Sequence, residues 1–309
     1  MSEKRIFITG ASGSLGKALV MNLLATTQAT IVCYSRDPHK QNQLLELAKH
    51  SPRLRMVIGD VRDADRLYWN MRGSTDIIHT AALKHIDVGE YNPIEFVKTN
   101  IDGTINVADT ALKIGAERCL FISTDKACQP YNLYGRTKAV AERVWIRSNV
   151  YGRDKTHFSA VRYGNMFDSK GGVMESWQDK KPGDEITVHT PNPTRFVCFL
   201  SWAVQWVRDA LDNMRGGEIF VPADLKAVSM VSLAEEIAGW QYVNMLPLLP
   251  GEKQHEVLIA PEEYQSAVTV DIGASSFHII NPDEQQWAYE VWQGSYAEPM
   301  MYTSELVKH

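Results

Sequence analysis

Cysteine is scarce in this sequence, and long apolar runs and blocks of like charge are missing from it. The four cysteines among 309 residues are scattered without any CxxC spacing, so neither a disulfide framework nor a metal site is expected. No apolar run approaches the roughly 20 residues of a membrane span. The net charge is −5, and no polybasic segment suggests a nucleic acid or an anionic membrane as partner. Because the N-terminus leads straight into a strand pattern, we expect no signal peptide and a cytoplasmic protein.

A glycine-rich turn lies between the first strand pattern, at residues 5–9, and the first helical pattern, which begins at Lys17. In the spacing G-x-x-G-x-x-G, the first glycine allows a tight turn, the second lets a pyrophosphate approach the backbone, and the third lets helix pack on strand. An ordinary glycine turn is the alternative. The sequence therefore predicts a dinucleotide site at Gly10, Ser12, Gly13, Ser14, Leu15 and Gly16.

The end of the second predicted strand bears on which dinucleotide binds. An enzyme that uses NAD usually has an acidic residue there for the ribose 2′-hydroxyl. Here Ser35 and Arg36 follow the strand and Lys40 is close by. A hydroxyl and a guanidinium suit a 2′-phosphate, so the sequence favours NADP. Asp37 keeps NAD possible as the alternative.

Residues after the third and fourth predicted strands complete the predicted cofactor site. Asp60 is placed to accept a hydrogen bond from the adenine amino group, and Val61 to pack on the adenine ring. Ala81 and Ala82 are small residues where the cofactor backbone must pass. Lys84 lies just beyond them, and Asn100 falls in a helix predicted from Pro93 to Leu112. The alternatives are a helix cap at Asp63, which is compatible with the adenine role of Asp60, and a hydrogen-bonded core amide at Asn100.

Chemistry-bearing residues gather after the fifth strand pattern, at residues 119–122. Thr124, Asp125 and Lys126 follow this strand, and Tyr134 and Lys138 open the next helical pattern. Carboxyl ends of strands are where an open α/β sheet places its chemistry. Tyr134 and Lys138 are four residues apart and share one helix face, so we expect the lysine to lower the phenol's pKa. A half-buried tyrosine beside a solvated lysine is the alternative.

Strands and helices alternate through residue 150, which predicts an α/β fold with a doubly wound parallel Rossmann sheet. After residue 165 glycine and proline interrupt the pattern. We therefore expect an NADP-binding Rossmann domain at residues 1–165. Residues 166–309 are expected to form mainly a smaller α/β substrate-binding lobe, interleaved with late strands of the sheet.

The chain resembles the extended short-chain dehydrogenase/reductase superfamily, and within it the soluble UDP-N-acetylglucosamine 4,6-dehydratases that invert C5, of the pseudaminic-acid pathway type. The matching segments are Thr9-Gly10-x-x-Gly13-x-x-Gly16, Tyr34-Ser35-Arg36-Asp37, Ala81-Ala82-Leu83-Lys84-His85, Lys98-Thr99-Asn100, Ser123-Thr124-Asp125-Lys126, Tyr134-Gly135-x-Thr137-Lys138, Arg162-Tyr163-Gly164-Asn165, Thr194-Arg195-Phe196 and Pro250-Gly251-Glu252-Lys253-x-His255-Glu256. Asp125-Lys126 is the specific part, because dTDP-glucose dehydratases carry Asp-Glu there.

The resemblance implies an NADP-dependent hydro-lyase that converts UDP-N-acetylglucosamine into a 4-keto-2,6-dideoxy sugar nucleotide. In that chemistry Tyr134, helped by Lys138 and Thr124, takes the proton of the C4 hydroxyl while C4 gives a hydride to the cofactor. Lys126, held neutral by burial and by Lys138, removes the C5 proton, and Asp125 protonates the departing C6 hydroxyl. The chemistry itself requires one base and one acid without ordering them.

The resemblance also implies that Lys84, Asn165, Lys170, Arg195 and Glu252 bind the UDP-sugar, with orientation of a neighbouring cation as the alternative for Glu252. Departures from the family at Leu249, at 166–170 and at 188–193 lie in the substrate lobe. They keep open another nucleotide sugar, such as UDP-glucose. A UDP-sugar epimerase and a non-enzymatic NADP-binding regulator are further alternatives. By resemblance alone, we expect a homo-oligomer.

Overall fold

The computed structural model describes residues 4–169, 173–177, 179–190 and 192–282, together with two short strands at 295–296 and 302–303. Ten strands form the main sheet: β1 (Arg5–Thr9), β2 (Thr30–Ser35), β3 (Leu54–Ile58), β4 (Asp76–His79), β5 (Arg118–Ile122), β6 (His157–Val161), β10 (Ile219–Pro222), β14 (Val268–Ile272), β15 (Ser275–Ile280) and β16 (Ser295–Tyr296). Their order is β16-β14-β15-β10-β6-β5-β4-β1-β2-β3.

Strands β3 to β10 in this order are parallel, whereas β15, β14 and β16 extend the sheet in antiparallel pairs. The predicted α/β Rossmann sheet is thereby confirmed. The central strands are continuous apolar runs that are buried on both faces, as parallel strands require. The segment after residue 261 supplies this antiparallel edge.

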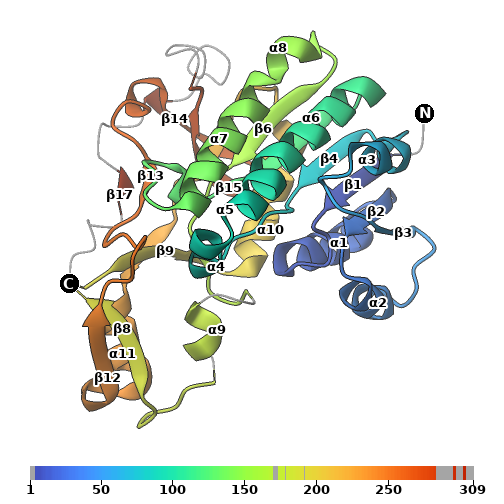
Figure 1. Cartoon of the computed structure of the whole chain (residues 1–309). Helices are drawn as coiled ribbons and strands as arrows, with labels where there is room; N and C mark the ends of the chain where they lie inside the picture. Colours follow the sequence, from blue (N-terminus) through green and yellow to red (C-terminus); the bar gives the residue numbers. More distant parts are fainter. Residues whose placement is uncertain are drawn as a thin grey trace.

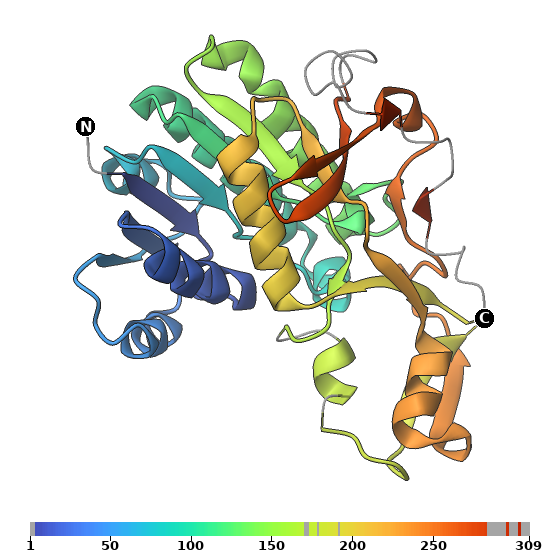
Figure 2. The same cartoon turned by 180° about the vertical axis from the view of Figure 1, so that it is seen from behind.

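Helices cover both faces of the sheet. The long ones are α1 (Ser14–Thr26), α2 (Pro38–Leu47), α3 (Ala64–Met71), α6 (Gly103–Ile114), α7 (Leu133–Arg147) and α10 (Leu200–Asn213). Helices α6 and α7 cover the face seen in Figure 1. Helices α1 and α10 lie side by side on the other face (Figure 2), where Arg208 donates a hydrogen bond of 2.7 Å to Asn22. The sheet is therefore doubly wound.

Trp145 anchors α7, the helix that carries two predicted catalytic residues. Its side chain is fully buried, and its indole N–H donates to the carbonyl of Ser159 at 3.1 Å. The ring stacks on Phe121 of β5, with 5.6 Å between centroids. This packing holds the C-terminal part of α7 against β5 and β6.

The helix predicted from Pro93 to Leu112 is wrong in its detail. The segment forms α5 (Pro93–Phe96), a π-helical turn η1 (Val97–Asp102) and α6. A Cβ on Gly103 would lie 2.6 Å from Val61 Cγ2, so the helix approaches the end of β3 closely there. Widened π turns often occur at functional sites, and this one carries Asn100.

A smaller lobe lies beyond the carboxyl ends of the parallel strands (Figure 1). It contains α9 (Val173–Trp177), α11 (Met230–Ala238) and the parallel pair β8 (Ile186–Thr190) and β12 (Val243–Pro247). Its own apolar cluster is formed by Trp177, Ile186, Val188, Met230, Ala234 and Ala238. A three-stranded sheet of β11 (Lys226–Ser229), β9 (Thr194–Cys198) and β7 (Asn165–Met166) connects the lobe with the end of β6.

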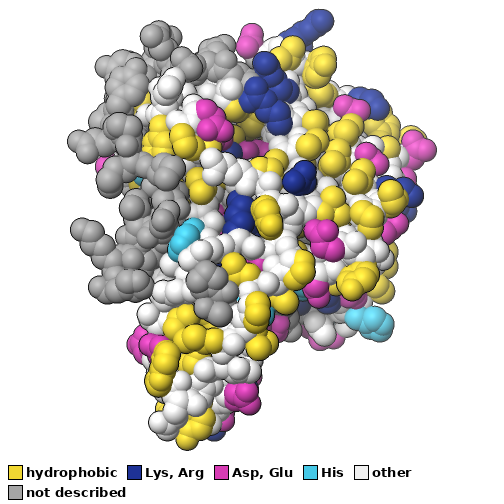
Figure 3. Space-filling model, turned by 60° about the vertical axis from the view of Figure 1, so that its left-hand side comes forward, with side chains coloured by type: hydrophobic (Ala, Val, Ile, Leu, Met, Phe, Trp, Pro, Cys, Tyr) yellow, Lys and Arg dark blue, Asp and Glu magenta, His cyan; other side chains and the backbone are white. Residues whose placement is uncertain are grey.

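Short elements complete the described chain. These are α4 (Ile86–Tyr91), α8 (Asn149–Gly152), β13 (Val257–Ile259), β17 (Tyr302–Thr303) and the 3-10 turns η2 (Asp125–Ala127), η3 (Trp240–Tyr242) and η4 (Tyr264–Ser266). Every helix within the described ranges is too short or too polar to cross a bilayer. On the face in Figure 3, lysine and arginine side chains form separate groups among hydrophobic and acidic ones.

Candidate active site

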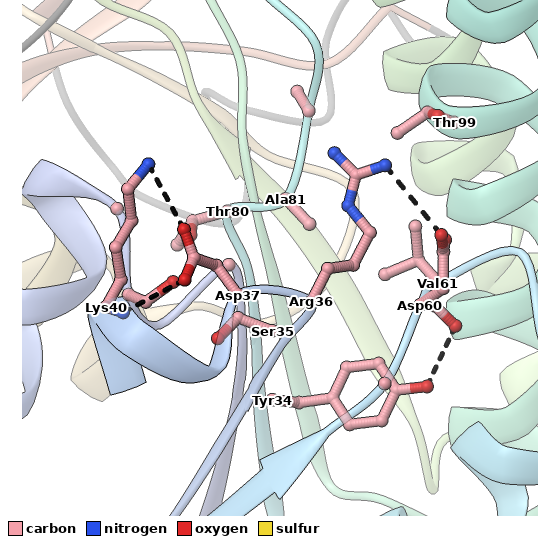
Figure 4. A pocket seen from close by; sticks show the side chains of 15 residues that line it. Tyr34, Ser35, Arg36, Asp37, Lys40, Asp60, Val61, Thr80, Ala81 and Thr99 are labelled. Atoms are coloured by element: carbon pink, nitrogen blue, oxygen red, sulfur yellow. Dashed lines mark hydrogen bonds and ion pairs between the residues drawn. The ribbon is translucent and has the colours of Figure 1, made fainter. Parts of the chain in front are cut away.

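A cavity of about 260 Å³ opens where β1, β2, β3 and β4 end. Most of the predicted cofactor residues line it, namely Gly10, Ser12, Gly13, Ser35, Arg36, Lys40, Asp60, Val61, Ala81 and Ala82. They come from four loops that lie far apart in the sequence, and Figure 4 shows their side chains around one space. The parallel topology brings them together, because the carboxyl ends of the strands share one edge of the sheet.

Gly10 fits the predicted phosphate cradle. Its φ of +65° lies in the left-handed region, and a Cβ there would stand 2.7 Å from Thr80 Oγ1 and 2.8 Å from the Ala81 nitrogen. The Gly13 N–H donates to the Gly10 carbonyl at 2.9 Å, which closes the turn. Only glycine fits here, because a side chain would collide with the loop that follows β4.

The rest of the glycine turn packs the helix onto the strand and does not line the cavity. Ser14 begins α1, and Leu15 is buried in the core. A Cβ on Gly16 would come within 2.6 Å of Ala11 Cα. These residues therefore position the N-terminus of α1, where the helix dipole favours an anion.

Charged side chains surround the end of β2. The Asp37 carboxylate accepts a hydrogen bond of 3.0 Å from the Lys40 backbone N–H and caps α2. Arg36 Nη1 lies 3.8 Å from Asp60 Oδ2, and its side chain crosses the mouth of the cavity (Figure 4). The side chains of Arg36 and Lys40 remain 52% and 60% exposed, so both are accessible to a ligand in this cavity.

Gln41 holds the Ser35 hydroxyl, and sequence reasoning missed it. Its amide nitrogen donates to the Ser35 carbonyl at 2.9 Å, to Ser35 Oγ at 2.9 Å and to the Val57 carbonyl at 2.7 Å. The two carbonyls fix which end of the amide is the nitrogen. Because the amide has two hydrogens and three acceptors, one hydrogen is shared with Ser35 Oγ, which accepts it. The hydroxyl hydrogen of Ser35 can then be donated elsewhere. The signal for this role was the position of Gln41, a polar residue on the buried side of an otherwise exposed helix.

Asp60, predicted to bind the adenine amino group, is paired with Arg62 in this structure. Arg62 donates to Asp60 Oδ2 from Nε at 3.0 Å and from Nη2 at 2.7 Å. Arg62 also pairs with Glu95 of α5. These contacts and hydrogen bonds outweigh the partial burial of Asp60 and lower its pKa. Its role toward adenine stays a prediction.

Asn100 is buried and bridges two parts of the site. Its amide nitrogen donates to the Leu83 carbonyl and to Thr137 Oγ1, each at 3.0 Å, and its oxygen accepts from the Leu83 N–H at 2.8 Å. The residue thus ties η1 to the loop after β4 and to α7. It holds the loop that contains Ala81 and Ala82 against the helix of Tyr134.

The predicted acid and base lie together at the end of β5. Thr124 donates to Asp125 Oδ1 at 2.9 Å, and Lys126 Nζ donates to the same oxygen at 3.0 Å. Lys126 Nζ also donates to Asn165 Oδ1 at 2.8 Å and lies 3.6 Å from Glu256 Oε1. Asp125 Oδ2 is buried and has no hydrogen-bond partner within the described residues. One carboxylate oxygen is therefore directed away from the lysine.

Lys126 is not held neutral, contrary to the prediction. Burial alone would lower its pKa, but the charges of Asp125 and Glu256 outweigh burial and raise the pKa. Lys138, the expected neighbour, is not among the leading influences on the pKa of Lys126, whereas the charge of Arg195 lowers this pKa. Lys126 and Asp125 therefore form a buried ion pair in this structure.

Tyr134 and Lys138 share one face of α7, but Lys138 does not act on the phenol as predicted. Its ammonium donates to the Ile122 carbonyl at 2.6 Å and lies 3.6 Å from the centre of the Phe121 ring. Burial lowers the pKa of Lys138 to about 7. Burial also raises the pKa of Tyr134 to about 12, while Lys126 and hydrogen bonding with Thr124 oppose that rise. Lys126 is thus the cation that favours the phenolate.

Residues predicted to bind the sugar nucleotide are spread over both parts of the molecule. Arg195 of β9 is buried, and its guanidinium donates to Glu252 Oε1 at 2.9 Å. Glu252 Oε2 lies 2.9 Å from His189 Nδ1, so Glu252 orients neighbouring basic groups, the alternative predicted for it. Lys84 follows β4 at the surface, and Lys170 lies outside the described residues.

Glu256 and Lys253 complete the cluster, although neither was predicted as a site residue. Glu256 is buried, and Lys253 Nζ lies 3.4 Å from its Oε2. Lys253 also donates to the Cys128 carbonyl at 3.0 Å. The charged run Pro250–Glu256 was the available signal, since charges in a buried loop are retained only when they are paired.

Comparison with known proteins agrees with this geometry. The profile of the family described as "Polysaccharide biosynthesis protein" matches residues 6–274. The chain is 37% identical over 285 residues to a protein of Campylobacter jejuni named "UDP-N-acetylglucosamine 4,6-dehydratase (inverting)", covering 91% of this chain and 84% of that protein. The resemblance predicted from the motifs is confirmed.

Solved structures share the fold. The structure titled "X-ray structure of Pen from Bacillus thuringiensis" superposes with a TM-score of 0.86 at 29% identity, over 99% of this chain and 95% of that one. DesIV, a dTDP-glucose 4,6-dehydratase from Streptomyces venezuelae solved with NAD, has a TM-score of 0.71 at 21% identity, over 81% and 86% of the two chains. The extent of the family match and of these likenesses shows that the chain belongs to the polysaccharide biosynthesis protein family of short-chain dehydrogenase/reductase-type enzymes.

Proposed function

We propose that the protein is a UDP-N-acetylglucosamine 4,6-dehydratase that inverts C5. The observation that carries this proposal is the buried pair of Asp125 and Lys126 beside Tyr134, at the carboxyl edge of a dinucleotide-type sheet. A pure oxidoreductase needs the tyrosine alone, whereas loss of water also requires a base for C5 and an acid for the C6 hydroxyl. The name of the Campylobacter relative supports the same reaction.

Residues 1–165 are proposed to bind a nicotinamide dinucleotide, and residues 166–309 to bind mainly the sugar nucleotide. The glycine turn that leads into the N-terminus of α1 supports a pyrophosphate site there. When bound, the dinucleotide would supply the hydride acceptor for C4 and the hydride donor for C6. NADP is preferred over NAD because Arg36 and Lys40 are accessible and Gln41 leaves the Ser35 hydroxyl free to donate to a 2′-phosphate. The carboxylate of Asp37 is used to cap α2.

Tyr134 is proposed to accept the proton of the C4 hydroxyl. With a pKa of about 12 the phenol is protonated at neutral pH, so its ionisation depends on the nearby cation. Lys126 supplies that charge in this structure. Thr124 contributes hydrogen bonding to the same phenol. Lys138 holds the end of β5 through the Ile122 carbonyl, and its contact with the cofactor is proposed from the sequence alone.

Lys126 and Asp125 are proposed to act at C5 and C6. The chemistry needs Lys126 neutral as base and Asp125 protonated as acid. A single proton that moves across their 3.0 Å contact, from ammonium to carboxylate, produces both forms at once. Neutral Lys126 then takes the C5 proton, and protonated Asp125 gives its proton to the departing C6 hydroxyl, which leaves as water. Proton return to the other face of C5 gives the inverted product.

Mass spectrometry of nucleotide sugars incubated with the purified protein and NADP⁺ tests the proposal. UDP-N-acetylglucosamine, UDP-glucose and dTDP-glucose are compared side by side. Loss of one water from UDP-N-acetylglucosamine supports it, and loss of water from another sugar instead reassigns the substrate. Isomerisation without loss of water would make the protein an epimerase. A cytoplasmic location and a homo-oligomeric state stay predictions from the sequence.

A further inference from the structure

A second carboxylate shares the Lys126 ammonium with Asp125. Glu256 Oε1 lies 3.6 Å from Lys126 Nζ, and Glu256 Oε2 lies 3.4 Å from Lys253 Nζ. The Glu256 side chain is only 3% exposed, and Lys126 and Lys253 are 14% and 16% exposed. Two carboxylates and two ammonium groups are thus enclosed in one buried cluster. The cluster consists of Lys126, Lys253, Glu256 and Asp125, and its formal charge is zero.

We infer that Glu256 is a positioning residue that holds Lys126 protonated in the resting site. Lys253 weakens this effect of Glu256 on Lys126, because its ammonium shares the Glu256 carboxylate. This inference rests on the proposed role of Lys126 as the C5 base. Glu256 reaches Lys126 from the loop before β13, whereas Asp125 belongs to the same turn as the lysine. The lobe therefore controls the charge of a base that the Rossmann part carries.

Other charged or titratable groups face Lys126 as well. Asp125 contacts it from η2, and Tyr134 approaches it from α7. The charge of Arg195 on β9 lowers the pKa of Lys126. Asn165 of β7 contributes a neutral oxygen at 2.8 Å. The charges that raise the pKa of Lys126 are those of Asp125 and Glu256. Because Asp125 must itself take the proton in the reaction, Glu256 is the carboxylate that keeps its charge throughout.

Charge removal at Glu256 should make Lys126 easier to deprotonate. An opposite charge within about 4–6 Å shifts a pKa by about 1–3 units. In the Glu256→Gln variant, exchange of the C5 hydrogen should therefore begin at a pH at least about one unit lower than in the wild type. Replacement of Lys253 should act in the opposite direction, because Glu256 would then interact with Lys126 alone.

The experiment follows C5 hydrogen exchange in D₂O by NMR, across a range of pH. The probe is the 4-keto product, prepared with the wild-type enzyme and repurified, because its exchange needs the C5 base and no hydride transfer. Wild type, Glu256→Gln and Lys253→Gln are compared, with non-enzymatic exchange subtracted. Glu262→Gln is the matched control, since Glu262 is an exposed carboxylate on the segment that follows β13.

The inference is supported when the Glu256→Gln profile moves to lower pH, the Lys253→Gln profile moves to higher pH and the Glu262→Gln profile coincides with that of the wild type. It is overturned when Glu256→Gln and Lys253→Gln both follow the wild-type profile. It is also overturned when Glu256→Gln binds NADP normally but exchanges at no pH, because Glu256 would then do the chemistry itself. Should Glu256→Gln not fold, the direction of the Lys253→Gln shift decides. Absence of exchange in the wild type would instead refute the proposed C5 chemistry.

Discussion

Replacement of Lys126 by methionine should separate the two half-reactions. The side chain keeps its length but loses the amine that is proposed to remove the C5 proton. Lys126 is also the leading group that lowers the pKa of Tyr134 against the effect of burial. Its loss should raise that pKa by about one unit or more, since nearby charges shift pKa values by about 1–3 units. Each unit reduces the phenolate population at neutral pH about tenfold.

The Lys126→Met variant should therefore oxidise C4 at least about tenfold more slowly than the wild type, while C5 exchange is lost altogether. Stopped-flow absorbance of the reduced cofactor measures C4 oxidation, and NMR in D₂O measures C5 exchange. Lys98→Met, at an exposed position of η1, serves as the control and should match the wild type in both assays. Undiminished C5 exchange in Lys126→Met would refute the assignment of the base.

Three further predictions concern cofactor choice and stability. Arg36→Ala should weaken NADP binding at least about tenfold, the loss of one charge-assisted contact, and leave NAD binding nearly unchanged in titration calorimetry; equal weakening of both would contradict a 2′-phosphate contact. Gln41→Leu should reduce the preference for NADP over NAD through the released Ser35 hydroxyl, and an unchanged preference would show that Gln41 serves packing alone. Burial lowers the pKa of Lys138 from 10.5 to about 7, so the unfolded chain binds more protons between these pH values and stability rises with pH there. The free energy of unfolding of the wild type, relative to that of Lys138→Met, should therefore increase over this pH range by at most about 5 kcal/mol, since 10.5 − 7 = 3.5 units at about 1.4 kcal/mol each. Denaturant unfolding at several pH values measures this difference. A difference that does not change with pH would show that Lys138 is charged throughout.

The sheet and the location of the site were predictable from the sequence because both follow from local patterns. Buried parallel strands appear as short apolar runs, and a glycine-rich turn between a strand and a helix is typical of a dinucleotide site. Topology then places the ends of these strands together. Gly10, Arg36 and Val61 consequently line one cavity, as their positions after successive strands indicated.

Directions of side chains and contacts with the lobe could not be predicted in the same way. Lys138 lies on the expected helix face, yet its ammonium is bound by the Ile122 carbonyl. Glu256 reaches Lys126 through a loop whose path depends on how the lobe packs, and no local pattern encodes that path. Burial and charge together decide the pKa of Lys126, so its protonation could be known only after both carboxylates were placed.

Internal hydride transfer is the central claim, and the fate of a deuterium label at C4 tests it most directly. UDP-N-acetylglucosamine deuterated at C4 is incubated with the protein and NADP⁺ in ordinary water, and the product is examined by NMR. The proposed mechanism predicts that the label moves from C4 to the new C6 methyl group, with loss of one water and no external reductant. Retention of the label at C4, or its release to solvent, would contradict the proposed dehydratase mechanism.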